Sequence, residues 1–221
     1  MKPWLLIASA RTRETELSLH RRGDEWVIRA DGRPLMSSRQ HGSEEALARL
    51  ALEQVRHPKQ VLIGGLGLGF TARAALNLLP AAATLCIAEL TPALIEWNRI
   101  HLGACAHHPL DDPRVRAVPC DVLEQLEGHP RAWDAILLDV DNGPAAMVHS
   151  SNQRLYGPAG IAACVSALRP GGALAVWSAG PDASYLKRLA AAGLDAIAHV
   201  APARGERGGA RQVVFVARRP R

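Results

Sequence analysis

Short apolar runs alternate with amphipathic segments along most of the chain, and this alternation predicts a parallel β-sheet. From about residue 60 onward, each apolar run of strand length is followed by a segment with helical spacing of apolar residues. The successive pairs are QVLIGG and FTARAALNLL, TLCIAE and PALIEWNRIHL, VRAVPC and DVLEQLEG, DAILLDV and a helix near 158–168, and GALAVWS and ASYLKRLAAAG. Such βαβ repetition is typical of a mostly parallel sheet with helices on both faces.

The two ends of the chain follow other patterns. Near the N-terminus, the strand-like runs WLLIAS, ELSLHRR and EWVIRA are separated by polar or Gly-Asp turn signals, which predicts a small β-meander. A linking helix is expected over 42–55, with Ser43 as its N-cap and with Glu44 and Glu45 in its first turn. Near the C-terminus, LDAIAHVA and RQVVFVARR are joined by the Gly-rich PARGERGGA without a helix, which predicts an antiparallel hairpin.

These patterns together predict an α/β fold. We expect a Rossmann-like, methyltransferase-type, mostly parallel sheet that ends in a C-terminal antiparallel hairpin, because the hairpin disfavours a plain dinucleotide-binding sheet. The predicted domains are a small N-terminal β region over 1–41 and a nucleoside-binding α/β domain over 42–221. A chain of 221 residues, 48% of them hydrophobic, is long enough to bury a sizeable core.

Composition and charge narrow the function classes. The first apolar segment is only about six residues long, and no later run approaches the roughly 18 apolar residues of a membrane span, so we expect a cytoplasmic protein without a membrane partner. The four cysteines are widely spaced and the histidines near Cys105 lack a recognised ligand spacing, so neither disulfides nor a metal is expected. The net charge of +5 comes mostly from arginines dispersed near both ends, which is more typical of a solvated surface than of a nucleic-acid site.

The segment VLIGGLGLGF holds the strongest chemical signal. Gly65, Gly67 and Gly69 fall at the first strand-to-helix turn, where missing side chains let the backbone approach a ligand and a helix N-terminus presents free N–H groups. A dinucleotide fingerprint would place another glycine at position 70, but this residue is Phe70, which disfavours NAD. The loop indicates a nucleotide-like ligand, and a tight turn packed for its own sake is the alternative.

Acidic residues follow three successive predicted strands, at the sheet edge where such folds bind ligands. Glu89 lies about 20 residues beyond Gly69, the spacing at which a carboxylate accepts both hydroxyls of an adenosine ribose. Asp121 either contacts an adenine amino group or caps the helix that follows it. Asp139 ends the fourth strand, and Asp141 lies just beyond it. Acidic strand ends in this register favour an S-adenosylmethionine-type ligand.

Several segments together resemble a known family. QVLIGGLGLGFTARAAL, AELTPALIEWNR, CDVLEQL, WDAILLDVDNGP and LRPGGALAVWSA are similar to successive motifs of spermidine synthases and their short bacterial relatives. The resemblance covers roughly residues 25–180, and the order and spacing of the motifs make it more specific than any one of them. It implies a transferase whose donor, decarboxylated S-adenosylmethionine, lies over the glycine-rich loop and whose acceptor is a small amine.

The resemblance also implies roles for individual residues. Glu89 would hold the ribose of the donor, and Asp121 and Val122 would lie near the adenine. Asp139 matches the aspartate that helps accept a proton from the attacking amine, because a carboxylate can bind an ammonium group and then hold the neutral nitrogen against the sulfonium carbon. The family's second acid is shifted here to Asp141 or replaced by the amide that follows it.

Departures from the family pattern leave the donor and the acceptor open. Leu68 stands where the family has an aspartate facing the primary ammonium of the decarboxylated donor, so methyl transfer from intact S-adenosylmethionine is an alternative. Trp177 replaces the glutamine that closes strand five, HGSEE lacks the family's tyrosine, and the terminal proline–tyrosine stretch has no counterpart. Trp177 and Tyr156 either line an acceptor pocket or pack in the core.

The sequence thus leaves three functions to distinguish: aminopropyl transfer to a small amine, methyl transfer, and nucleoside binding without turnover. The residues expected to bind the donor are Gly65, Gly67, Leu68, Gly69, Glu89, Asp121, Val122 and Asp139. The residues expected to act on the acceptor are Asp139, Asp141 and Tyr156. The sequence is silent on oligomeric state, and a homodimer is compatible with it.

Overall fold

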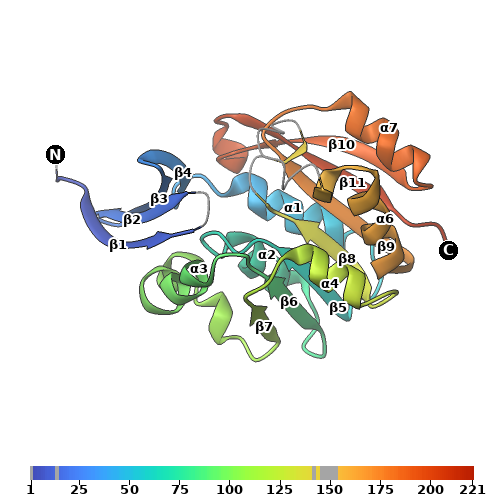
Figure 1. Ribbon diagram of the computed structural model, residues 1–221, viewed down its shortest axis with the longest axis horizontal. Coiled ribbons are helices and arrows are strands. Elements are labelled where there is room, and N and C mark those ends of the chain that lie inside the picture. The colour runs from blue at the N-terminus through green and yellow to red at the C-terminus, as the bar shows by residue number, and fades with distance from the viewer. Residues whose placement is uncertain (1, 13–14, 141–142, 145–153) are drawn as a thin grey trace.

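The N-terminal part of the chain forms a small antiparallel sheet (Figure 1). The computed structural model describes residues 2–12, 15–140, 143–144 and 154–221. Within them, the strands of this sheet follow one another in chain order: β1 (Leu5–Arg11), β2 (Glu16–Arg22), β3 (Glu25–Ala30) and β4 (Arg33–Ser37). The predicted meander is present, but β4 was not among the predicted strands. β4 is a short edge strand that contains Pro34 and is largely exposed, so it carries little apolar pattern.

The main sheet confirms the predicted methyltransferase-type fold. Its described strands are β5 (Gln60–Gly64), β6 (Thr84–Ala88), β7 (Val115–Val118), β8 (Trp133–Leu138), β9 (Leu168–Ser178), β10 (Asp195–Pro202) and β11 (Arg211–Arg218). They lie in the order β10-β11-β9-β8-β5-β6-β7. Strands β5 to β9 pair in parallel, whereas β11 runs antiparallel to both β9 and β10. The C-terminal hairpin therefore adds two strands to one edge of the parallel sheet.

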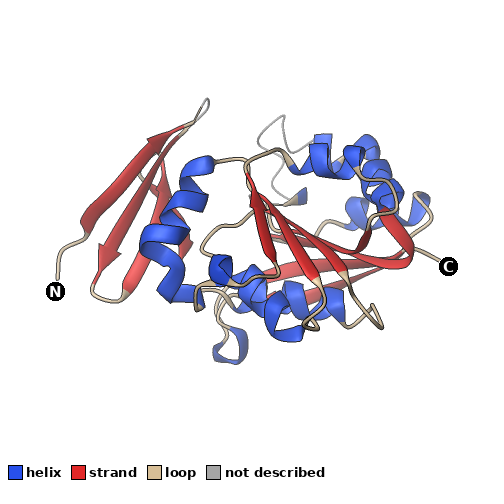
Figure 2. Ribbon diagram, turned by 90° about the horizontal axis from the view of Figure 1, so that it is seen from below, coloured by secondary structure: helices blue, strands red, loops and turns tan. Residues whose placement is uncertain are grey.

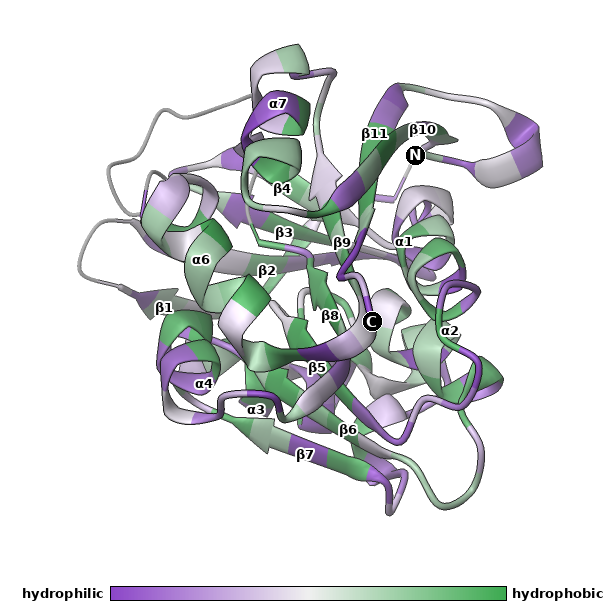
Figure 3. Cartoon of the chain, turned by 90° about the vertical axis from the view of Figure 1, so that its right-hand side faces the viewer, coloured by the Kyte–Doolittle hydropathy of each residue, from purple (hydrophilic) through white to green (hydrophobic). Residues whose placement is uncertain are grey.

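Helices cover both faces of the main sheet, so its strands are hydrophobic along most of their length (Figure 3). One face carries α1 (Gly42–Leu52) and α2 (Phe70–Leu78), and the other carries α4 (Val122–Gly128), α6 (Pro158–Ala167) and α7 (Ala183–Ala191). In β5, Val61 and Ile63 pack toward α1 and α2, whereas Leu62 packs toward α4 and α6. No helix in the described ranges is both long and apolar enough to cross a membrane.

Helix α1 begins at Gly42, as predicted, but it ends at Leu52 and its cap differs from the prediction. Its N-cap is His41, which makes no capping hydrogen bond through its side chain, and the N–H of Gly42 donates to the carbonyl of Ala203 at 2.9 Å. A Cβ on Gly42 would lie 2.1 Å from the backbone nitrogen of Gly205, so only glycine fits here. The prediction that Ser43 caps the helix is wrong, because contact with the C-terminal hairpin, rather than a side-chain cap, fixes the start of α1.

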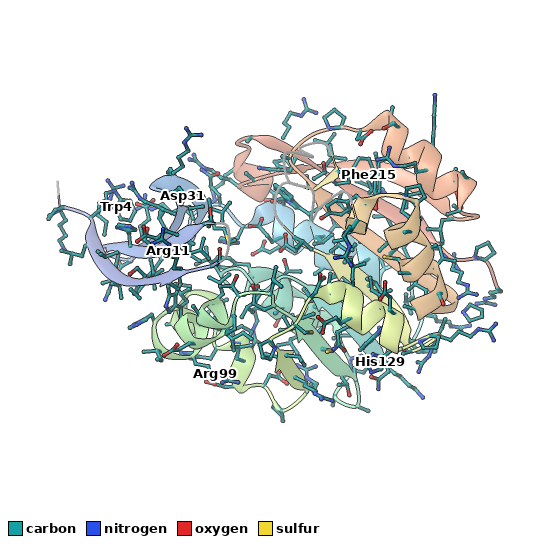
Figure 4. All side chains as sticks on the ribbon, in the orientation of Figure 1. Trp4, Arg11, Asp31, Arg99, His129 and Phe215 are labelled. Atoms are coloured by element: carbon teal, nitrogen blue, oxygen red, sulfur yellow. The ribbon has the colours of Figure 1, made fainter. Side chains whose placement is uncertain are left out.

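The N-terminal sheet lies at one end of the molecule, with helical segments between it and most of the main sheet (Figure 2). Leu19 and Ile28 from this sheet are fully buried against Phe70 of α2 and Trp97 of α3 (Pro92–Trp97). The opposite end of the sheet, near Trp4, points away from the α/β body (Figure 4). The two sheets thus share an apolar cluster, and a division at residue 42 stays a prediction.

Candidate active site

The glycine-rich loop joins β5 to α2 and lies against the end of β8. Gly65 has a φ of +89°, and a Cβ there would lie 2.2 Å from the carbonyl oxygen of Asp139. Gly69, with a φ of +86°, is the N-cap of α2. Both positions require glycine, one for close approach to β8 and both for the left-handed backbone. The sequence signal therefore reflects real constraints on the chain at the carboxyl edge of the sheet.

Glu89, which follows β6, anchors this loop. Its carboxylate accepts a 2.8 Å hydrogen bond from the N–H of Leu66 and another of 2.8 Å from the N–H of Thr91. The side chain is buried, and this burial raises the pKa of Glu89, although the amides of Leu66, Thr91 and Gly67 act in the opposite direction. Each carboxylate oxygen has two lone pairs, so Glu89 has capacity to accept a further donor while it holds the loop.

Asp139 lies next to the loop at the end of β8. Its N–H donates to the carbonyl of Gly64 at 2.8 Å, and the hydroxyl of Thr71 donates to its Oδ2 at 2.6 Å. Burial raises the pKa of Asp139 to about 6, against the opposing effect of the Thr71 hydrogen bond. The loop, Glu89 and Asp139 are thus brought together as the sequence predicted.

Glu44, in the first turn of α1, is a second carboxyl group in this region that the sequence analysis did not assign to the site. Its Oε2 accepts a 2.5 Å hydrogen bond from the hydroxyl of Ser43. Burial, followed by the charge of Asp139, raises the pKa of Glu44 to about 7. A signal was present in the sequence: the residues three and four positions after Glu44 are the apolar, buried Leu47 and Ala48, whereas the residue four positions after Glu45 is the exposed Arg49.

A cavity of about 170 Å³ lies between the loop, the start of α1 and the C-terminal hairpin. It is lined by Leu35, Met36, Ser37, Gln40, Ser43, Glu44, Leu66, Gly67, Leu68, Phe70, Asp139, Trp177, Ala203 and Gln212. Its volume is below the roughly 300–1,000 Å³ of typical small-molecule pockets. The cavity therefore has the size for a short chain rather than for a whole nucleoside, and its acidic groups are Glu44 and Asp139.

Leu68 and Trp177 both belong to the cavity wall. Leu68 is 5% exposed and packs in the same apolar cluster as Leu17 and Leu19 of the N-terminal sheet. Trp177 is half-buried at the end of β9, and its indole nitrogen has no hydrogen-bond partner among the described residues. Of its two predicted placements, in a pocket or in the core, Trp177 therefore takes the one that lines a pocket.

Comparisons with known proteins match this fold. No family model matches the chain. The polyamine aminopropyltransferase of Mycobacterium tuberculosis (strain CDC 1551 / Oshkosh) is 30% identical over 180 residues, which are 80% of this chain and 33% of that protein. The polyamine aminopropyltransferase 2 of Pseudomonas aeruginosa is 34% identical over 136 residues, which are 60% of this chain and 37% of that protein. The chain thus spans about a third of the length of each of these curated relatives.

A solved structure extends the match to almost the whole chain. A spermidine synthase in complex with the transition state analogue AdoDATO superposes with a TM-score of 0.81 at 20% identity, over 96% of this chain and 73% of that one. The chain is spermidine synthase-like. The family resemblance expected from the motifs is confirmed. Among the described residues of this spermidine synthase-like chain, no group of three His, Cys, Asp or Glu side chains is placed to hold a metal ion.

Asp121 and Val122, which were also predicted to bind the donor, lie at the start of α4. Asp121 is the N-cap of α4, and its Oδ1 accepts a 2.9 Å hydrogen bond from the N–H of Leu123. Val122 is buried, and its Cγ2 lies 2.9 Å from where a Cβ on Gly64 would be. The capping interpretation of Asp121 is therefore correct, and contact of Asp121 and Val122 with an adenine stays a prediction.

Tyr156 lies in the core of the spermidine synthase-like chain. It is fully buried, its hydroxyl donates to the carbonyl of Val140 at 2.9 Å, and its ring meets the ring of Tyr185 edge-on at 6.0 Å. Tyr156 does not line the cavity, so its placement matches the packing interpretation rather than the pocket interpretation. Asp141, the other predicted acceptor residue, lies outside the described residues.

Proposed function

We propose that this chain transfers an aminopropyl group from decarboxylated S-adenosylmethionine to a small amine. The observation that carries the proposal is the pair of carboxyl groups, Glu44 and Asp139, in a cavity beside the glycine-rich loop. An ammonium group is the natural partner of such a pair, because it donates hydrogen bonds and offsets the charge that burial disfavours. The names of the curated relatives, polyamine aminopropyltransferase, support the same chemistry.

The donor would bind across the loop, with its adenosine outside the cavity and its propyl chain directed into it. Glu89 is buried at the edge of the loop with lone pairs to accept a ribose hydroxyl. Asp121 and Val122, on the other side of β5, would contact the adenine. The small volume of the cavity supports this division, because the propyl chain and a short amine need far less room than a nucleoside.

The carboxyl pair would prepare the amine for attack. A protonated amine binds Asp139 and Glu44, passes a proton to the pair, and presents a neutral nitrogen to the propyl carbon beside the sulfonium. The nitrogen–carbon bond forms as the carbon–sulfur bond breaks, and the sulfur keeps the electron pair as a neutral thioether in methylthioadenosine. Positioning supplies much of the rate, because both reactants are held at fixed sites.

Leu68 favours a second candidate, methyl transfer from intact S-adenosylmethionine. This residue places an apolar side chain in the cavity wall and so offers no negative charge to the donor's ammonium and no repulsion to a donor carboxylate. In methyl transfer the nitrogen–carbon bond would form to the sulfonium methyl instead. The two candidates differ in the nucleoside that they release.

Calorimetric titration with S-adenosylmethionine, decarboxylated S-adenosylmethionine, methylthioadenosine and NAD separates these functions, followed by product analysis with an amine panel. We expect the decarboxylated donor to bind tightly and to yield methylthioadenosine with an aminopropylated amine. Tight binding of the intact donor with a methylated amine would replace this proposal with methyl transfer. Nucleoside binding with no product from any donor and amine would indicate a binding module.

Asp139→Asn tests the role of the carboxyl group. We expect turnover to be lost while the affinity for methylthioadenosine stays within a few-fold, because the group acts mainly on the acceptor. Asp24→Asn, in the exposed turn between β2 and β3, is the matched control and should retain turnover. Full activity of Asp139→Asn would remove Asp139 from the mechanism.

A further inference from the structure

Two polar side chains, Trp177 of β9 and Gln212 of β11, form one wall of the cavity. Trp177 of β9 pairs with Val214 of β11, and Gln212 lies two residues before Val214 on the same strand. Residues two apart on a strand share a face, so Trp177 and Gln212 lie on the face covered by α1. This wall meets the start of α1, where Glu44 lies.

Both side chains have a buried polar atom without a partner among the described residues. These atoms are the indole nitrogen of Trp177 and the Oε1 of Gln212. Buried polar atoms are nearly always hydrogen-bonded, and leaving one unsatisfied costs about 1–3 kcal/mol. Because both residues line a cavity, a bound molecule is the partner that would satisfy them.

The hydrogen-bonding chemistry of Trp177 and Gln212 specifies which group of a bound molecule can lie against this wall. An indole N–H only donates, so its partner must be a hydrogen-bond acceptor in either orientation of the Gln212 amide. A protonated amine has no lone pair and cannot fill this role. The two acidic residues of the cavity, Glu44 and Asp139, are needed for the reacting amine, so a second ammonium would find no carboxylate at the wall.

We propose that the acceptor is a short amino acid, with a primary amine at one end and a carboxylate at the other, rather than a diamine. The amine binds Glu44 and Asp139. The carboxylate accepts the indole N–H of Trp177 and, with the Gln212 amide turned so that its nitrogen faces the cavity, an N–H of Gln212. This inference rests on the proposed function, since it names the acceptor for the same site. It differs from the acceptor that the relatives' names indicate, and the difference comes from the wall formed by Trp177 and Gln212.

Titration calorimetry with a matched set of four-carbon amines tests the inference. 4-Aminobutyrate, 4-amino-1-butanol, butylamine and putrescine are titrated into the protein with and without saturating methylthioadenosine. We expect 4-aminobutyrate to bind about tenfold more tightly than butylamine, which corresponds to one charged hydrogen bond, and putrescine to bind no more tightly than butylamine. Tighter binding of putrescine than of 4-aminobutyrate would overturn the inference and leave the proposed function intact.

Two variants assign the preference to the wall. Trp177→Phe keeps an aromatic ring but removes the N–H, and should weaken 4-aminobutyrate about tenfold without affecting butylamine. Gln212→Glu adds a carboxylate at the wall and should reverse the preference toward putrescine. Gln54→Glu, which adds the same charge near the end of α1 and outside the cavity, should leave the order unchanged. Thermal melts of each variant show that it is folded.

The outcomes keep the two proposals separate. The expected order of amines in a protein that binds no nucleoside would overturn the proposed function but retain the inference about the cavity. Unchanged affinity for 4-aminobutyrate in Trp177→Phe would overturn the inference. If Trp177→Phe instead weakens intact S-adenosylmethionine alone, the donor's carboxylate occupies the wall and the inference is again wrong.

Discussion

At the scale of single residues, the site is defined by two carboxyl groups that reach the cavity from different elements. Asp139 comes from the end of β8 and Glu44 from the first turn of α1. Each is held where its charge is costly, and each raises the cost of ionising the other. Such a pair titrates as a unit near neutral pH, so its proton occupancy should control what the cavity binds.

The affinity for a simple amine should therefore rise with pH. The pKa of Asp139 is about 6 and that of Glu44 about 7, while a primary amine keeps its proton to about pH 10, so the cation meets an increasingly charged pair between pH 5.5 and 8. Titration of butylamine across this range measures the effect. Glu44→Gln should remove the upper part of the rise, whereas Glu45→Gln, its exposed neighbour, should not. An affinity that is independent of pH would contradict the role of the pair.

Gly65→Ala should be far more destabilising than a glycine substitution with the same backbone strain. Gly65 and Gly23 both have positive φ, but a Cβ on Gly23 meets no atom within 4 Å, whereas one on Gly65 would overlap the carbonyl oxygen of Asp139. We expect Gly23→Ala to lower the free energy of unfolding by about 1–2 kcal/mol and Gly65→Ala by several kcal/mol more. Urea unfolding of both variants measures the difference. Equal decreases in the free energy of unfolding would mean that the loop shifts to accommodate the added methyl group.

At the scale of secondary structure elements, the sequence predicted the order of strands and helices but not the contacts that fix their ends. The alternation of apolar runs predicted β5 to β9 because strands buried on both faces are nearly continuously apolar. The cap of α1 was misassigned because the start of this helix is held by Ala203, about 160 residues away in the sequence. Glu44 was missed for a related reason: its helix face is visible in the sequence, but the cavity that this face meets is built by the distant hairpin.

Asp134 shows how one side chain joins several elements at the amino end of the sheet. Its Oδ2 accepts the N–H groups of Lys59 and Gln60 at 2.8 and 2.9 Å, and both of its oxygens accept from Arg169 at 2.9 Å. Asp134 thus connects the starts of β5 and β8 to β9 on the side of the sheet away from the cavity. Its charge-assisted hydrogen bonds make it a contributor to stability rather than to chemistry.

Asp134→Asn should therefore destabilise the fold without affecting ligand affinity. The amide loses the charge and part of the acceptor capacity, which we expect to lower the free energy of unfolding by about 1.5–3 kcal/mol. Asp195→Asn, an exposed residue at the start of β10, is the matched control and should change it by less than about 0.5 kcal/mol. Urea unfolding and a methylthioadenosine titration measure the two effects. Similar stability of the two variants would show that the network contributes nothing measurable.

At the scale of the whole molecule, titratable groups with opposite shifts set the pH of greatest stability. The pKa of Asp112 is lowered to about 2, chiefly by its hydrogen bonds with Arg114, so its contribution is present above pH 4 and lost toward pH 2. Burial raises the pKa of Glu44 to about 7 and that of Asp139 to about 6, so the stability that they contribute near pH 4 is lost as pH rises toward neutrality. Burial also raises the pKa of Glu89, which acts in the same direction. The lowered pKa of His20, caused by burial and Arg29, partly opposes this loss.

The free energy of unfolding should therefore be greatest near pH 4–5 and fall toward pH 7.5, in contrast to the optimum between about pH 5 and 8 of many proteins. The pKa of Glu44 rises from 4.5 to about 7 and that of Asp139 from 3.8 to about 6, so the two groups account for roughly 5 kcal/mol of the fall between pH 4.5 and 7.5, since one pKa unit corresponds to about 1.4 kcal/mol. Urea unfolding at pH 3, 4.5, 6 and 7.5 measures the curve. The double variant Glu44→Gln and Asp139→Asn should flatten its upper part, because it removes the protons that the folded state retains. An equal fall in the double variant and in the unmodified protein would mean that other titratable groups, rather than the carboxyl pair of the cavity, cause the pH dependence of stability.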